Sequence, residues 1–326
     1  NVFPYSQFPQ EKELKGEVIE LDTALFRYPF RIRIEGDKAI VLDLHGSDYY
    51  GHLFQYPSFR YLSSFGRRGD SPLEMLSMEN FRLHNHTLWT LDANKSELTR
   101  LDFSSSGDSL LREETVALDE DILRPLDFAI YNDTTFVIPD YSGESRFLKV
   151  DCKGKLIEKI GTIPTTNKKA LQEARPALAQ AWRSFLDYNS HNSVLATVTQ
   201  LGEVVEIYNL KDSTHVIRVG EYDEPEFKVS DGYGIPTGIM GFSDVQVTDD
   251  AIYAVFHGTS FKDIARQSGR LSDGGKYIYV FSLKGEPLCK YALDHYIYGI
   301  WVDEVTKTIM ATDVNNDQPI LKFSFG

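Results

Sequence analysis

The sequence predicts an all-β fold, a six-bladed β-propeller that is closed by an N-terminal strand and carries a helical insertion between blades three and four. Three observations favour this fold class. A pattern of short strands recurs about every 50 residues, six copies fill the chain, and the strand that the last copy lacks has a counterpart near the N-terminus. Such repetition is typical of propellers, and it outweighs the two domains that a length of 326 residues suggests by itself.

Each copy begins with an apolar residue that opens a first strand, and a second strand ends 11 to 14 residues later. The opening residues are Phe30, Phe81, Phe128, Phe185, Val245 and Ile300, and the second strands end at Asp43, Asp92, Asp140, Thr199, His257 and Asp313. A third strand, rich in Val, Ile, Tyr and Phe, follows each of these positions. We expect Asp92, Asp140 and Asp313 to form polar turns, because Asp side chains accept hydrogen bonds from nearby backbone amides.

A fourth strand is recognisable in the first five copies and is missing from the sixth, whose third strand runs into the C-terminus. An unpaired edge of this kind is costly for a β protein. The letters LKGE at 14–17 recur at 283–286, where they lead into the fourth strand of the fifth copy. Residues 15–22 are therefore predicted to complete blade six together with residues 297–326, so that one domain spans 1–326. An open β-sandwich with coincidental spacing is the alternative.

Residues 166–185 break the repeat and form the predicted helical insertion. No β-branched residue occurs between Lys168 and Trp182, and Pro176 fits the first turn of a second helix. Two more long segments, 221–240 and 259–275, are rich in Gly, Ser and Asp and are expected to be loops. Propellers usually carry their function on such loops at one face of the ring.

Composition excludes several classes of partner. The chain has 34 basic and 48 acidic side chains, a net charge of -14, and this balance argues against nucleic acid and against an anionic membrane surface. No stretch approaches the roughly 18 apolar residues of a membrane-spanning helix, so no transmembrane segment is predicted. The two cysteines, Cys152 and Cys289, lack the spacing of a zinc site.

No metal site and no cofactor are predicted. Residues 313–317 (DVNND) have the alternating oxygens of a calcium loop, but the Gly and Glu that an EF-hand needs at its sixth and twelfth positions are Gln and Ser. His84 and His86 would share one face of a strand, yet no third ligand is identifiable. Residues 269–276 (GRLSDGGK) depart from the Walker phosphate loop at its Lys.

The candidate ligand-binding residues lie near the starts of the first strands, which line the channel of a propeller. They are Arg31, Arg82, Asp127, Arg183 and Asp244. Such a cluster would bind an anion or a sugar-like ligand, because Arg offers planar bidentate donors. The alternative is that these residues form ion pairs between blades and merely hold the ring together. Aromatic residues near the same openings would supply stacking surface or belong to the core: Tyr28, Trp182, Phe242, Tyr298 and Trp301.

Residues 65–75 (FGRRGDSPLEM) resemble the FG-x-x-G-x-x-P-x-E blade ending of NHL-related six-bladed propellers, although the other blades lack this ending. With its inserted helix, the whole chain resembles the TolB-like six-bladed propeller family, which consists mostly of uncharacterised secreted or lipid-anchored bacterial proteins. The resemblance implies a cell-envelope location, periplasmic or lipid-anchored, with any leader outside the printed chain. It implies no catalytic residues.

The function expected from these features is recognition of an unknown small ligand or of an envelope protein. We expect binding at the loops 221–240 and 259–275 and at the inserted helix. The alternative is a metal-dependent hydrolase or lactonase at the channel mouth, which would need Asn80, Asp127 and Asp244 to converge on an ion. The chain has no G-x-S-x-G nucleophile elbow, and an enzyme is the less favoured class. A purely structural scaffold is a third possibility.

Overall fold

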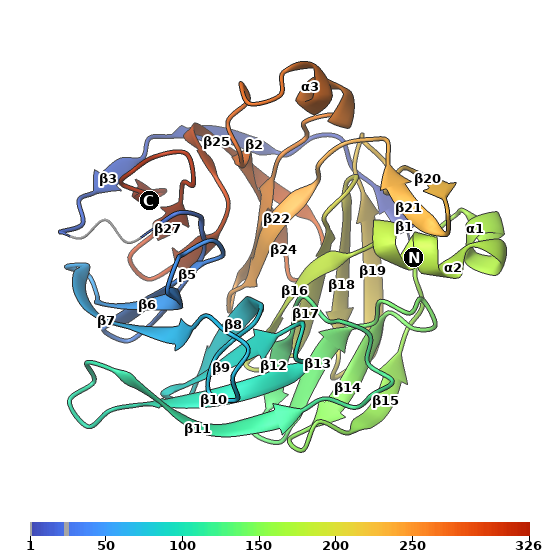
Figure 1. The fold of residues 1–326 in the computed structure, drawn as a ribbon. Helices are drawn as coiled ribbons and strands as arrows, with labels where there is room; N and C mark the ends of the chain where they lie inside the picture. Colours follow the sequence, from blue (N-terminus) through green and yellow to red (C-terminus); the bar gives the residue numbers. More distant parts are fainter. Residues whose placement is uncertain (1, 23–25) are drawn as a thin grey trace.

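The computed structural model describes residues 2–22 and 26–326. Six antiparallel sheets of four principal strands stand around a central axis (Figure 1). The predicted all-β, six-bladed propeller is thus confirmed. Two sheets carry a fifth, outermost strand, and a separate two-stranded hairpin projects from the ring.

In each blade the strands follow one another outward from the axis. Blades 1 and 2 comprise β4 (Pro29–Glu35), β5 (Lys38–Asp43), β6 (Tyr49–Gln55) and β7 (Arg60–Arg67), then β8 (Met78–His84), β9 (Thr87–Asp92), β10 (Glu97–Phe103) and β11 (Leu110–Ala117). Blades 3 and 4 comprise β12 (Ala129–Asn132), β13 (Thr135–Pro139), β14 (Phe147–Asp151) and β15 (Leu156–Ile160), then β16 (Ser184–Asn189), β17 (Val194–Thr199), β18 (Val204–Asn209) and β19 (Thr214–Val219). Blade 5 comprises β22 (Phe242–Val247), β23 (Ala251–Phe256), β24 (Gly275–Ser282) and β25 (Pro287–Ile297).

Blade 6 combines both ends of the chain. It comprises β26 (Ile300–Asp303), β27 (Thr308–Thr312), β28 (Ile320–Ser324) and, as its outer strand, β3 (Glu17–Ile19). Val18 faces Leu321 in the antiparallel register of β3 and β28. The N-terminal strand therefore closes the ring, as the repeated LKGE letters predict.

The segment before β3 adds two strands that the sequence did not predict. Strand β1 (Val2–Pro4) pairs in parallel with β19, and β2 (Gln10–Leu14) pairs in parallel with β25. The N-terminal segment thus runs along the outer edges of blades 4, 5 and 6, where Figure 1 shows it as a blue trace beside later strands. Four of the five residues of β2 are exposed. The sequence of this strand therefore lacks the alternation of apolar and polar residues from which a strand could be predicted.

The helical insertion lies between β15 and β16, as predicted. It contains α1 (Lys168–Glu173) and α2 (Arg175–Ala181), and the side chain of Asn167 caps α1 by accepting from Ala170 N at 3.0 Å. The two segments predicted as loops carry further structure, the hairpin β20 (Phe227–Ser230) and β21 (Tyr233–Pro236) and a third helix, α3 (Phe261–Arg266). None of the helices among the described residues is long and apolar enough to cross a membrane.

The two ends of the ring differ. At one end, the hairpin face, lie the turns between the first and second strands, each of which is short. At the other end, the loop face, lie the connections from blade to blade and from second to third strands, including all three helices and β20–β21. The predicted aspartate turns lie at the loop face and are confirmed. Asp92 accepts from Asn94 N at 3.2 Å, Asp140 accepts from Ser142 N at 2.9 Å, and Asp313 accepts from Asn315 N at 2.9 Å.

Apolar cores fill the spaces between blades. Each of six clusters combines residues of two neighbouring blades, and the cluster between blades 6 and 1 joins Met310 and Ile320 to Ile32 and Phe54. Burial of this apolar surface is the main favourable term in assembling the ring. An enclosed ion pair also joins blades 3 and 4, where Arg146 Nη2 lies 2.6 Å from Glu206 Oε2, with exposed fractions of 3% and 0% for the two side chains.

Removing one partner of this pair should destabilise the protein strongly. Glu206→Gln leaves the Arg146 guanidinium buried without its counter-charge, which costs about 3–5 kcal/mol in comparable sites. The matched control is Glu144→Gln, because Glu144 pairs with Lys159 at 2.7 Å in an exposed position, where a pair contributes about 0–1 kcal/mol. Urea unfolding followed by circular dichroism measures both losses, and equal losses would contradict the assigned role of the buried pair.

Candidate functional site

The inner strands of the six blades leave one backbone edge facing the axis, because each inner strand is the last strand of its sheet. Side chains from the preceding blade bond to this edge. Arginines donate to its carbonyls, with Arg33 Nε 2.8 Å from Phe81 O and Arg82 Nε 2.7 Å from Phe128 O. Carboxylates accept from its amides, in the pairs Asp127 with Leu186 N (2.8 Å), Asp187 with Val247 N (2.7 Å) and Asp244 with Ile300 N (2.9 Å).

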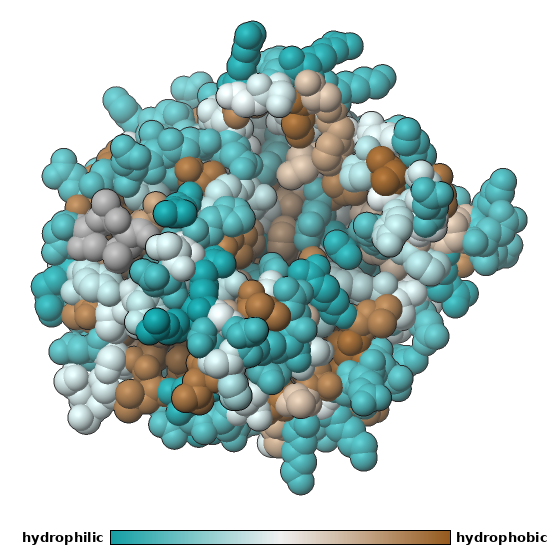
Figure 2. Space-filling view, viewed as in Figure 1, coloured by the Kyte–Doolittle hydropathy of each residue, from teal (hydrophilic) through white to brown (hydrophobic). Residues whose placement is uncertain are grey.

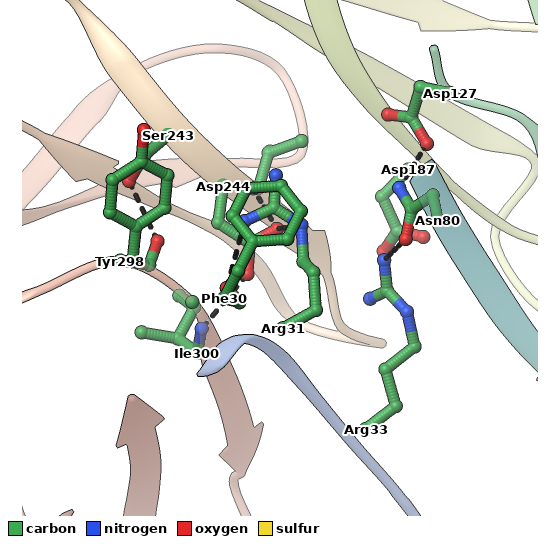
Figure 3. Close-up of polar contacts among 12 residues, drawn as sticks. Phe30, Arg31, Arg33, Asn80, Asp127, Asp187, Ser243, Asp244, Tyr298 and Ile300 are labelled. Atoms are coloured by element: carbon green, nitrogen blue, oxygen red, sulfur yellow. Dashed lines mark hydrogen bonds and ion pairs between the residues drawn. The ribbon is translucent and has the colours of Figure 1, made fainter. Parts of the chain in front are cut away.

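Arg82 is the hub of this network. Besides its bond to blade 3, its Nη1 donates to Asp187 Oδ1 at 2.8 Å and its Nη2 donates to Leu186 O at 2.6 Å, both in blade 4. Nη2 also lies 3.2 Å from Asp127 Oδ1. Figure 3 shows that Asp127 accepts from Asn80 as well. One guanidinium therefore ties three blades together and neutralises the buried carboxylate of Asp127 and the partly buried carboxylate of Asp187.

The five predicted binding residues fall into three groups. Arg82 and Asp127 belong to the network just described. Arg31, which is 1% exposed, lies 3.8 Å from Asp244 and between the rings of Phe30 and Phe185, at 4.0 and 4.6 Å from their centroids (Figure 3). Its buried Nε and Nη2 have no hydrogen-bond partner in the described part of the chain.

Arg183 stands apart from both groups. It follows α2 at the loop face, and its guanidinium lies 5.4 Å from the centroid of the Tyr141 ring. The structure thus brings Arg82 to Asp127 and Arg31 to Asp244, but it does not bring all five residues together. Ligand binding by these five residues stays a prediction.

A large cavity opens at the hairpin face, opposite the loops that the sequence favours. We call it the funnel; it has a volume of about 780 Å³ and is lined by the first turns of the blades. Its floor has one residue from each inner strand: Arg33, Arg82, Ala129, Asp187, Gln246 and Val302. Tyr56, Tyr188 and Trp301 add aromatic surface to its walls. Figure 2 shows that the ring is hollowed near its centre and largely hydrophilic outside.

Arg33 is the cation at this floor that lacks a counter-charge. It is 3% exposed, and no carboxylate lies within 4.0 Å of it among residues 2–22 and 26–326. Its Nε and Nη2 donate to Phe81 O and to Asn80 Oδ1, the latter at 3.1 Å, which leaves Nη1 for a ligand. Burial, assisted by Arg82 and Arg31, lowers the pKa of Arg33 to about 9, and the nearby carboxylates of Asp244 and Asp187 act in the opposite direction. An anion bound beside this guanidinium would supply a counter-charge and stabilise its charged form.

The rim of the funnel carries histidine–carboxylate contacts between neighbouring blades. His84 Nε2 lies 2.9 Å from Asp133 Oδ1, and His191 Nδ1 lies 3.0 Å from Asp249 Oδ1. A third contact joins the exposed His86 to Glu35 at 3.4 Å. The two histidines that the sequence places on one strand face therefore have separate carboxylate partners on different blades.

The three residues that a metal-dependent hydrolase would require do not converge. Asn80 and Asp127 bond to each other, whereas Asp244 accepts from Val245 N and Ile300 N in blades 5 and 6. Across the part of the chain that the structure describes, no group of three or more His, Cys, Asp or Glu side chains could hold a metal ion. The geometry gives the hydrolase alternative no support.

Arg33, Asp187 and Gln246 are the floor residues that sequence reasoning missed. Alternate residues of a strand point to the same side, so Arg33 follows from Arg31, and Gln246 follows from Asp244. The polar first turns were a second available signal, since the turn of every blade contains an Asp, Glu or His. Neither signal identifies which arginine lacks a carboxylate partner.

A family model described as TolB-like 6-blade propeller-like matches residues 7–305. The chain belongs to this TolB-like family. No functionally curated protein matches it. Among solved structures, this TolB-like chain is similar to an exported protein of Bacteroides fragilis, with 12% identity, a TM-score of 0.61 and 99% of each chain covered.

Two further structures share the fold of the TolB-like chain. A member of the DUF4221 family from Bacteroides vulgatus has 9% identity and a TM-score of 0.58, with 97% of this chain and 96% of that chain covered. An auxiliary nutrient binding protein of Bacteroides ovatus has 11% identity and a TM-score of 0.57, with 92% of this chain and 70% of that chain covered. At such identities the similarity shows the fold alone.

Replacing each of the two floor arginines by an uncharged residue should change the free energy of unfolding by very different amounts. Arg82→Met leaves Asp127 and Asp187 buried without their shared cation and should cost about 3–5 kcal/mol of unfolding free energy. Arg33→Met loses two hydrogen bonds but also removes an uncompensated buried charge, so the net change should stay within about 1 kcal/mol. Urea titrations of both variants measure the difference, and a loss at Arg33 as large as that at Arg82 would show that Arg33 is part of the supporting network.

Proposed function

We propose that this TolB-like propeller is a binding protein of the cell envelope that holds a small anionic, sugar-like ligand in the funnel. The observation that carries the proposal is the buried Arg33 guanidinium at the floor, which has no carboxylate within 4.0 Å among the described residues. A ligand carboxylate or phosphate would supply the missing counter-charge through planar, charge-assisted hydrogen bonds.

The other lining residues suit a sugar ring attached to that anion. Trp301, Tyr56 and Tyr188 offer flat apolar faces, and Asn189 and His191 offer hydrogen-bonding groups nearer the mouth. A volume of about 780 Å³ lies in the range typical of small-molecule sites. The predicted residues Arg82 and Asp127 would act as positioning residues, because Asp127 holds Asn80, which in turn accepts from Arg33.

Arg31, Arg183 and Asp244 would contact a ligand only if it entered from the loop face, because β4 and β22 begin at that end of the ring. The envelope location is supported by the similarity to an exported protein and to an auxiliary nutrient binding protein. Binding is favoured over catalysis because the carboxylates of the channel, Asp127, Asp187 and Asp244, are engaged with backbone amides or with Arg82.

The test is a thermal shift with sugar acids. Glucuronate, galacturonate or gluconate should raise the Tm, since a ligand at 100 times its Kd adds about 2.7 kcal/mol of stability. Glucose, which lacks the carboxylate, should give no comparable rise. Arg33→Gln should abolish the shift, whereas the control Arg60→Gln, at an exposed position of β7, should keep it. Equal shifts in both variants, or no shift with any of the three acids, would contradict the proposal.

A further inference from the structure

A second cavity lies at the loop face, far along the strands from the funnel. Residues 5–9, which join β1 to β2, cover it as a strap across blades 4 and 5, and Glu11 of β2 also lines it. We call it the strap pocket; its volume is about 320 Å³, and its walls include Glu203, Glu221, Tyr277, Tyr279 and Lys290. None of these residues takes part in the funnel.

Glu203 is a buried carboxylate that lacks a cation. It is 3% exposed, and no Lys, Arg or His nitrogen lies within 4.0 Å of it in the described ranges. The hydroxyl of Tyr5, which is 8% exposed and belongs to the strap, also lines this pocket and has no hydrogen-bond partner among the residues described. The Tyr5 hydroxyl lowers the pKa of Glu203, so the two groups lie close together, and a bound molecule would meet both of them.

Aromatic rings form much of the remaining wall. The ring centroids of Phe8 and Tyr279 are 4.8 Å apart, and Tyr5 meets Tyr279 edge-on at 6.5 Å. The ammonium of Lys290 lies 4.5 Å from the centroid of Tyr277 and 5.8 Å from that of Tyr279, so these rings already contact one cation, which a second cationic group would have to share or displace. Aromatic faces attract ammonium groups, most strongly where water is excluded.

The charges of the lining are unbalanced. Glu11, Glu203 and Glu221 contribute three carboxylates, and Lys290 contributes one ammonium. A cationic guest would therefore reduce the imbalance, whereas an anionic guest would increase it. At the funnel floor, by contrast, the buried group without a direct counter-charge is the arginine Arg33, although the funnel lining as a whole also has more carboxylates than arginines.

We propose that the strap pocket binds a small organic ammonium compound, with Glu203 as its counter-charge and the rings of Tyr277 and Tyr279 against its alkyl groups. The site is separate from the funnel and does not depend on the ligand proposed there. The strap would order the pocket, because its Tyr5 and Phe8 supply part of the wall.

Cation binding at this site should depend on pH. Burial raises the pKa of Glu203 to about 7, Glu221 acts in the same direction, and Tyr5, the amide of Tyr222 and Lys290 oppose it. Tyr279, Glu11 and His257 also face the pocket, and burial, together with Arg31, lowers the pKa of His257 to about 4, so that this imidazole is neutral above pH 6. Between pH 6 and 8 the main change is the ionisation of Glu203.

The same ionisation affects stability. The folded-state pKa of Glu203 lies above the ordinary value of 4.5, so the protein is favoured while this group is protonated and loses that advantage as pH rises from 4.5 through 7. Glu203→Gln should therefore raise the Tm more at pH 8.0 than at pH 5.5, as measured by differential scanning fluorimetry. A larger gain at pH 5.5 would contradict the assigned burial of an unpaired carboxylate.

The binding test is calorimetric titration of the full chain with choline at pH 8.0 and pH 6.0. Choline should bind about tenfold more tightly at pH 8.0, because a group with a pKa near 7 is mostly ionised there and mostly protonated at pH 6.0. The neutral isostere 3,3-dimethylbutanol should bind weakly and without this pH dependence. No binding of choline at pH 8.0, or equal binding of the isostere, would overturn the proposal.

Single substitutions test whether choline binds in the strap pocket. Glu203→Gln, which removes a buried charge and should fold, is expected to abolish choline binding together with its pH dependence, and Tyr279→Leu should weaken binding through the aromatic wall. The matched control Glu221→Gln removes an exposed carboxylate at the same pocket and should change the affinity by less than about threefold. Arg33→Gln should leave choline binding intact, so failure of the funnel proposal would not affect this one. Unchanged binding in Glu203→Gln would overturn the assignment.

Discussion

The constraint on which the ring depends is the unpaired backbone edge that each inner strand presents to the axis. A buried amide or carbonyl without a partner is costly, and no further strand can enter the centre of a propeller to supply one. Here side chains of one blade bond to the inner strand of the next, through Arg33, Arg82, Asp127, Asp187 and Asp244 in turn. The polar side chains along the axis therefore help to hold the ring together. Ion pairs form among them because charged side chains that bond to the inner backbone edge also have to neutralise one another.

The need to bond this backbone edge distinguishes two kinds of charged side chain: those fully paired within the ring and those left without a counter-charge. Arg82 has a bond for each nitrogen and two carboxylate partners, so it has nothing left to offer a ligand. Arg33 satisfies a carbonyl in the same way, yet it has no carboxylate partner within the described residues and keeps one nitrogen free at the floor of the funnel. A buried cation in this state costs stability, and functional sites commonly retain groups of this kind.

Much of the fold could be predicted from the sequence, and less of the site. The blades were predictable because their strands alternate apolar and polar residues. The closing strand at 15–22 was predictable because the letters LKGE occur both at its start and before the fourth strand of the fifth blade. Strand β2 was not predictable, since its exposed residues pair with β25 through backbone alone. At the axis, strand alternation from Arg31 leads to Arg33, but the difference between Arg33 and Arg82 depends on contacts among three blades, which sequence spacing does not encode.

The N-terminal segment covers the outer edges of two blades and also encloses the strap pocket. Outer strands expose backbone that can pair with other chains, and proteins protect such edges with charge or by covering them. The outer strand β15 carries Glu158 and Lys159, and β11 carries Arg112, Glu113 and Glu114, so these blades rely on charge. Blades 4 and 5 are covered instead by β1 and β2. The chain that joins these two covering strands must cross the gap between the blades, and in crossing it places Tyr5 over the carboxylate of Glu203 and encloses a pocket that the four-stranded blades alone would leave open.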